Sequence, residues 1–132
     1  MKITYMMQSL RQIFLVPLFV LTMVATVIAH EVGLSANIRA QTLSGETTYT
    51  ADDLPTGAQI TSIEIIGMYS TGEPMSGAQV NIFAPGNPST PWQTGTLDAQ
   101  GRYTFTPDLT QRGRWTVRVE QTGHSGFMNL VI

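Results

Sequence analysis

Apolar and polar residues alternate along four stretches of the chain. These stretches are residues 61–69, 78–84, 102–106 and 114–120. In the last of them Trp115, Val117 and Val119 alternate with charged or hydroxyl-bearing side chains. A period of two residues is typical of a β-strand that has one buried and one exposed face. Apolar residues at helical spacing do not occur after the first 29 residues, so we expect an all-β domain.

Turn-forming residues separate these stretches. Asp98-Ala-Gln-Gly101 places Asp first and Gly last, which predicts a type I turn joining two antiparallel strands. Residues 70–77 and 84–91 are rich in Gly, Pro and Ser and are expected to be loops. The tail at 127–132 has the composition of a final strand. Short strands with turns at this spacing predict an antiparallel β-sandwich.

The segment at 30–60 has a weaker pattern. Thr47-Thr-Tyr-Thr50 is rich in β-forming residues, and Asp52-Asp-Leu-Pro-Thr-Gly57 has the composition of a turn. We therefore expect an N-terminal extension with one or two strands at 30–60, followed by the sandwich at 61–132.

Two apolar residues, Ile66 and Met68, fall on the outward face of the strand expected at 61–69. A solvated face normally carries polar side chains at such positions. The pattern therefore indicates that the early segment, or a partner, covers Ile66 and Met68.

The N-terminus has the three parts of a secretory signal. Lys2 and Arg11 are followed by an uncharged, mostly apolar run at 13–29, which ends on small or short side chains. We expect a signal helix at 1–29, cleavage after Ala29 and an extracytoplasmic (periplasmic or secreted) protein beginning at His30. The alternative is an uncleaved membrane anchor, for which the run is at the short limit.

Charge and cysteine content narrow the function classes. The whole chain has a net charge of −2. After the signal five arginines stand against nine acids, which leaves a net charge of about −4. This balance argues against nucleic acid and anionic membrane surfaces as partners, because both require clustered basic residues. There is no cysteine, so thiol catalysis, disulfides and thiolate metal sites are excluded.

Three motifs resemble the carboxypeptidase regulatory-like domain family. They are Gly72-Glu-Pro-Met-Ser-Gly-Ala-Gln-Val-Asn-Ile-Phe-Ala84, Thr96-Leu-Asp-Ala-Gln-Gly-Arg-Tyr-Thr-Phe105 and Trp115-Thr-Val-Arg-Val119. The resemblance covers residues 62 to about 121. It implies a prealbumin-like or immunoglobulin-like sandwich of about seven strands, and a noncatalytic role.

A narrower set of motifs resembles small secreted bacterial proteins associated with nickel and cobalt transporters. The motifs are Tyr69-Ser-Thr-Gly-Glu-Pro-Met-Ser-Gly-Ala-Gln-Val80, Phe83-Ala-Pro85, Thr90-Pro-Trp-Gln-Thr-Gly95 and Gly123-His124. Members of that group usually begin the mature chain with His, as this chain does if cleavage follows Ala29. The resemblance implies an accessory role in nickel or cobalt uptake, with a membrane metal transporter as partner.

The region after the signal contains two histidines, His30 and His124. A chain that begins at His30 offers an α-amine and an imidazole from one residue. With the His124 imidazole this makes a three-nitrogen set suited to Cu(II) or Ni(II), and Glu31 would add an oxygen. The resemblance adds Co(II) to these candidate metals. The alternative is that His30 is a frayed terminus and His124 a polar turn residue. The methionines form no M-x-M or M-x-x-M cluster, so Cu(I) is a weaker alternative.

Further candidates are contact residues. Trp92, which follows a Pro-rich loop, is interpreted either as a cap on one end of the sandwich or, with Met68, as a contact for a partner or sugar. Arg102, Arg114 and Arg118 point outward, which favours a solvated face or docking to an acidic partner.

No motif for catalysis occurs in the sequence: a nucleophile elbow, a phosphate-binding loop and a His-x-x-His pair are all absent. We therefore expect a protein that is not an enzyme. Two functions stay open, an accessory metal-binding component of nickel or cobalt uptake and a metal-free protein- or glycan-interaction module at the cell surface.

Overall fold

A computed structural model describes residues 31–132. The expectations for the signal helix, its cleavage and His30 lie outside this part of the chain. Within residues 31–132 no helix is long and apolar enough to cross a membrane.

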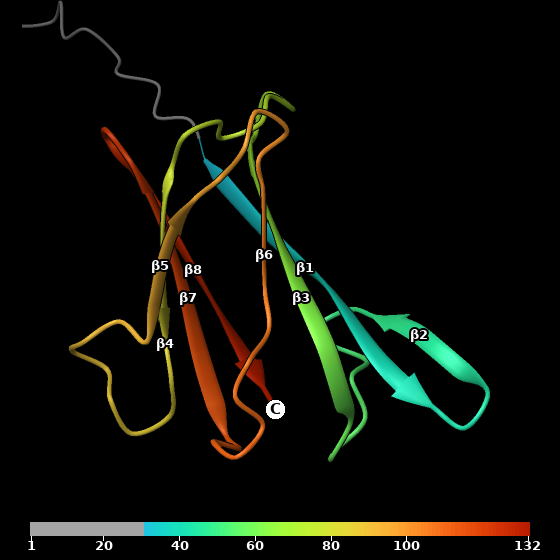
Figure 1. The fold of residues 1–132 in the computed structure, drawn as a ribbon. Coiled ribbons are helices and arrows are strands. Elements are labelled where there is room, and N and C mark those ends of the chain that lie inside the picture. Colours follow the sequence, from blue (N-terminus) through green and yellow to red (C-terminus); the bar gives the residue numbers. More distant parts are fainter. Residues whose placement is uncertain (1–30) are drawn as a thin grey trace, which may run out of the picture.

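Within residues 31–132, eight strands form two four-stranded antiparallel sheets that face each other (Figure 1). The first sheet has the order β2-β1-β3-β6, and the second has the order β5-β4-β7-β8. The strands are β1 (Val32–Thr42), β2 (Gly45–Tyr49), β3 (Gln59–Tyr69), β4 (Gln79–Phe83), β5 (Gln93–Thr96), β6 (Arg102–Phe105), β7 (Arg114–Gln121) and β8 (His124–Val131). The prediction of an all-β fold with two antiparallel sheets is confirmed, whereas the expected number of about seven strands is wrong by one.

The core lies between the two sheets and is built by the residues whose alternation predicted the strands. Ile63 and Ile65 of β3 and Trp115, Val117 and Val119 of β7 are fully buried. The residues between them on these strands are exposed or half-buried. Period-two alternation therefore places one face of each strand in a shared apolar interior.

The early segment is an integral part of the sandwich. β1 is eleven residues long, lies between β2 and β3, and pairs with β3 over almost its whole length. β1 therefore lies beside β3 within the sheet and not across its outer face. The early segment therefore does not cover Ile66 and Met68, which stay half-buried on that outer face, and cover by a partner stays a prediction.

The turn at Asp98–Gly101 forms as predicted, but it has a different role. The Asp98 carbonyl oxygen accepts a hydrogen bond from the Gly101 amide at 2.9 Å, and the Asp98 carboxylate accepts one from the Gln100 amide at 2.9 Å. The strands on either side, β5 and β6, belong to different sheets. The turn therefore carries the chain from one sheet to the other and does not close a hairpin.

A second Asp turn leads the chain into β7. The Asp108 carboxylate accepts hydrogen bonds from the Thr110 hydroxyl at 2.6 Å, the Gln111 side-chain amide at 3.1 Å and the Thr110 backbone amide at 3.0 Å. These bonds favour the ionised form and hold the pKa of Asp108 below its ordinary value. The Gln111 carbonyl in turn accepts a bond from the Trp115 indole at 2.8 Å, so the turn fixes the start of β7.

We expect Asp108→Asn to destabilise the protein at neutral pH and to lose its effect in acid. A carboxyl group whose pKa is lowered by folding contributes stability above its unfolded pKa, near 4, and loses it as pH falls through the folded pKa. The difference in urea midpoint between wild type and variant should therefore shrink below about pH 4. A difference that stays constant down to pH 2 would contradict this role of Asp108.

Candidate functional site

One end of the sandwich brings His124 close to the start of β1. His124 is the first residue of β8, directly after the turn that follows β7. Its half-buried imidazole packs edge-to-face against the Tyr69 ring, with the ring centroids 5.1 Å apart and the planes at 68°. The Tyr69 hydroxyl donates a hydrogen bond to the Gln121 side-chain carbonyl. Tyr69 therefore ties the end of β3 to the β7–β8 turn.

The same end of β3 holds the first described residues of the chain. Val32 pairs with Tyr69, and the Glu31 carbonyl accepts a hydrogen bond from the Ser70 amide at 2.9 Å. The backbone at Glu31 is therefore fixed within the first sheet, while its side chain is exposed. Figure 1 shows the start of β1 and the turn between β7 and β8 at the same end of the molecule.

A metal site at this end needs more than the described residues provide. Within residues 31–132 no group of three or more His, Cys, Asp and Glu side chains could hold a metal ion. His124 and Glu31 are the two described members of the predicted set, and the third, His30, lies outside the described residues. Met75 is fully buried in the core, and Met128 packs against the core. Both methionines are therefore placed as packing residues.

Trp92 lies over one end of the core. Its ring packs edge-to-face on Trp115, with centroids 4.9 Å apart at 84°, and on Phe105 at 6.4 Å and 60°. Its backbone amide donates to the Ile82 carbonyl at 2.7 Å. These contacts are those of a residue that covers the core, while 36% of Trp92 remains exposed to solvent.

Met68 lies elsewhere, on the outer face of the first sheet. It pairs with Gly33 of β1 and forms a β-bridge with Pro74, which belongs to the loop after β3. The structure therefore does not bring Met68 and Trp92 into one surface patch, since Trp92 contacts the core between the sheets and Met68 faces outward from β3.

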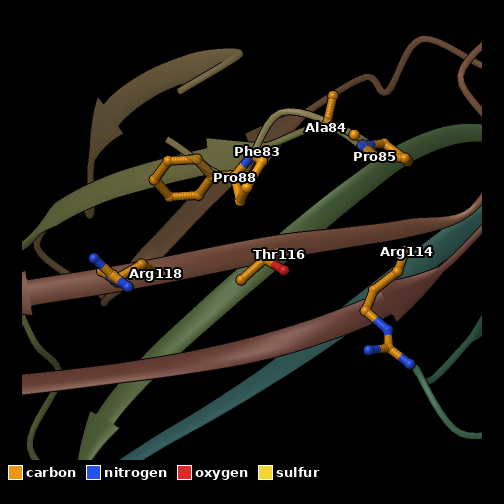
Figure 2. Close-up of a pocket in the computed structure, with 8 residues that line it drawn as sticks. Phe83, Ala84, Pro85, Pro88, Arg114, Thr116 and Arg118 are labelled. Carbon is orange, nitrogen blue, oxygen red and sulfur yellow. The ribbon is translucent and has the colours of Figure 1, made fainter. Parts of the chain in front are cut away.

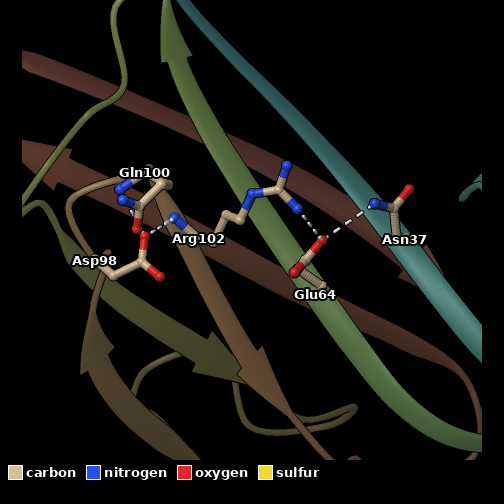
Figure 3. Close-up of polar contacts among 5 residues, drawn as sticks. All are labelled: Asn37, Glu64, Asp98, Gln100 and Arg102. Carbon is tan, nitrogen blue, oxygen red and sulfur yellow. Dashed lines mark hydrogen bonds and ion pairs between the residues drawn. The ribbon is translucent and has the colours of Figure 1, made fainter.

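The three outward arginines have different surroundings. The Arg102 guanidinium pairs with the Glu64 carboxylate at 2.8 Å, and the Asn37 side-chain amide donates to the same oxygen at 3.1 Å (Figure 3). Arg114 and Arg118 lie on the outer face of the second sheet, beside a hollow whose apolar wall is formed by Phe83 and the loop that follows it.

Arg114 and Arg118 were predicted from the sequence as outward residues, but the hollow beside them was not predicted. Phe83 was the available signal, because it falls at an outward position of a strand whose inward positions are Ala78, Val80, Ile82 and Ala84. An outward aromatic side chain beside outward arginines on a neighbouring strand indicates an interaction surface and not only a solvated face.

Comparison of the chain with models of known protein families, with curated proteins and with solved structures gave no match.

Proposed function

We propose that this protein is a noncatalytic extracytoplasmic β-sandwich domain that binds a divalent metal ion at its N-terminus, as an accessory component of nickel or cobalt uptake. The observation that supports this proposal is the position of His124. Its imidazole packs on Tyr69, the residue that pairs with Val32, so His124 lies near the point where the chain enters the sandwich. One residue, Glu31, separates Val32 from His30.

The donor set fits the chemistry of Ni(II), Co(II) or Cu(II). A chain that begins at His30 supplies an α-amine and an imidazole, and His124 supplies a second imidazole. The Glu31 carboxylate is exposed and free to contribute an oxygen. The fixed backbone of Glu31 and the packed ring of His124 reduce the entropy lost on assembling these donors. The metal would be cargo, which the domain presents to a membrane transporter.

We expect protein purified from the exported fraction and beginning at His30 to bind one equivalent of Ni(II) or Cu(II). His124→Ala should weaken binding at least tenfold, because an imidazole ligand contributes more than the outer-sphere groups whose loss costs about 10–100-fold. Calorimetric titration, and the visible absorption of the Cu(II) complex, measure this affinity.

The matched control places one additional Gly before His30, which keeps every side chain but moves the α-amine. Binding that survives this insertion unchanged would contradict chelation by the terminal residue. His124→Phe keeps an aromatic ring against Tyr69 and removes the ring nitrogens, so it separates metal binding from packing. If His124→Phe binds metal as tightly as wild type, His124 is a packing residue.

The second candidate function is a metal-free protein- or glycan-interaction module at the cell surface. Exposed large apolar residues favour it: 36% of Trp92 and 69% of each of Phe127 and Val131 is accessible to solvent. The titration with Ni(II) and Cu(II) separates the two functions, because a metal-free module shows no stoichiometric binding.

A further inference from the structure

The outer face of the second sheet carries a hollow of about 450 Å³ (Figure 2). Its floor is formed by Arg114, Thr116 and Arg118 of β7, and its wall by Phe83 and by Pro85 and Pro88 of the following loop. In Figure 2 Thr116 lies between the two arginines along one strand, and the Arg118 guanidinium lies near the Phe83 ring. We call these six residues the basic groove.

Neither guanidinium group of the basic groove has an acidic partner as close as that of Arg102. Among residues 31–132, no carboxylate lies within 4.0 Å of Arg114. Arg118 has a 3.8 Å contact with Glu120, and both side chains are about half exposed. Arg102 on the other sheet, by contrast, is paired at 2.8 Å. The Arg114 charge is therefore open to a ligand, whereas a ligand carboxylate at Arg118 would lie beside Glu120.

Apolar side chains flank both arginines. The Arg118 guanidinium lies over the Phe83 ring, 5.9 Å from its centroid. On the other side Phe127 of β8 pairs with Arg118, and Val131 pairs with Arg114. Phe127 and Val131 are each 69% exposed. A mixed surface of arginine, aromatic and aliphatic groups is the composition found at protein interfaces.

We infer that the basic groove binds an extended acidic segment of a partner protein, with two carboxylate side chains four residues apart. Arg114 and Arg118 point to the same face of one strand, and four residues of strand span about 13 Å. An extended peptide has the same rise, and its side chains at positions one, three and five face the same way. Its outer carboxylates therefore meet the two guanidiniums, and its middle side chain meets Thr116 and Phe83.

The net charge of the chain limits the attraction of an acidic partner to the groove itself. The protein is acidic overall, so an acidic partner is repelled at long range and attracted at the groove. Binding then depends on the placement of carboxylates against Arg114 and Arg118, within a Debye length of about 10 Å. Two acidic peptides with the same composition but different spacing should therefore differ in affinity.

The test uses the full exported protein and a fluorescein-labelled peptide with the core Glu-Thr-Val-Thr-Glu, measured by fluorescence anisotropy. Arg114→Ala and Arg118→Ala should each weaken binding about two- to fivefold, the range for one exposed ion pair. The double variant should weaken it by about four- to twenty-five-fold, which is the product of the two single effects. A peptide with the core Glu-Glu-Val-Thr-Thr should bind more weakly than the spaced one.

The matched control is Arg39→Ala, which removes one exposed positive charge from the other sheet. Affinity within about twofold of wild type is expected for it, so an equal loss for Arg39→Ala and Arg118→Ala would overturn the site. No binding at millimolar peptide would also overturn it. The last outcome is that an oligogalacturonate binds in place of the peptide, with the same dependence on Arg114 and Arg118. This result would assign the groove to acidic glycans and overturn the proposal of a peptide ligand.

Discussion

Replacing Trp115 with Ala is expected to destabilise the protein by about 3–5 kcal/mol. The side chain is fully buried between the two sheets and packs edge-to-face with Trp92. The substitution removes the largest fully buried side chain among residues 31–132 and leaves a cavity that the neighbouring strands can fill only in part. It also leaves the Gln111 carbonyl without the indole donor at 2.8 Å. Since small domains are stable by about 5–15 kcal/mol, the variant should be largely unfolded under mild denaturing conditions.

Urea unfolding followed by circular dichroism and by tryptophan fluorescence measures this effect. Trp92→Ala is the matched control, because Trp92 is the other tryptophan and is 36% exposed. It should cost clearly less than Trp115→Ala. Trp115→Phe keeps most of the apolar volume and loses the hydrogen bond, so it should fall between wild type and Trp115→Ala. Equal losses for Trp92→Ala and Trp115→Ala would show that the core does not centre on Trp115.

The elements that the sequence predicted well are those with bulky apolar residues on one face. β3 and β7 have this pattern, and most of their inward Ile, Trp and Val side chains are among the fully buried residues of the core. β1 has the same alternation from Val32 to Ala40, but Ala36 and Ala40 contribute little hydrophobic signal. For this reason the sequence predicted β1 only as part of an N-terminal extension, and not as a long inner strand of the first sheet.

β5 could not be predicted from apolar pattern, because its sequence is Gln93-Thr-Gly-Thr96. It is an edge strand that is held by backbone pairing with β4 and by a hydrogen bond from the Gln93 side-chain amide to the Tyr103 hydroxyl at 2.5 Å. Gly95 packs directly under the Tyr103 ring, and Tyr103 comes from the opposite sheet. The stability of such a strand resides in long-range contacts, which local sequence does not encode.

For the candidate sites, too, the residues could be predicted from the sequence but their neighbours in space could not. The residue types alone predicted His124 as a metal ligand, and Arg114 and Arg118 as docking residues. Their neighbours follow from the topology: Tyr69 reaches His124 because β3 ends and β8 begins at the same end of the sandwich, and Phe83 reaches Arg118 because β4 pairs with β7. Local sequence was enough to predict the Asp98–Gly101 turn, whereas the sheet that the chain enters next depends on the contacts of the whole fold.

Gly101→Ala is expected to destabilise the protein by about 2–5 kcal/mol, combining backbone strain with a steric clash. Gly101 has φ near +77°, a region that costs other L-residues about 1–2 kcal/mol. A Cβ atom at this position would also lie 2.5 Å from the backbone oxygen of Gly67 and 3.0 Å from Cβ of Pro74. The Gly67 amide donates to the Gly101 carbonyl at 2.8 Å, so neither backbone can shift without breaking the link between the turn and β3.

Gly123→Ala separates the two contributions. Gly123 has φ near +76°, almost the same as Gly101, but a Cβ atom there would have no other heavy atom within 4 Å. Gly123→Ala should therefore lower the free energy of unfolding by the backbone strain alone, about 1–2 kcal/mol. The difference between the two variants in urea unfolding measures the cost of forcing the cross-sheet turn away from β3. If the two losses are equal, the turn at Asp98–Gly101 is free to move, and its packing against Gly67 does not hold the sheets together.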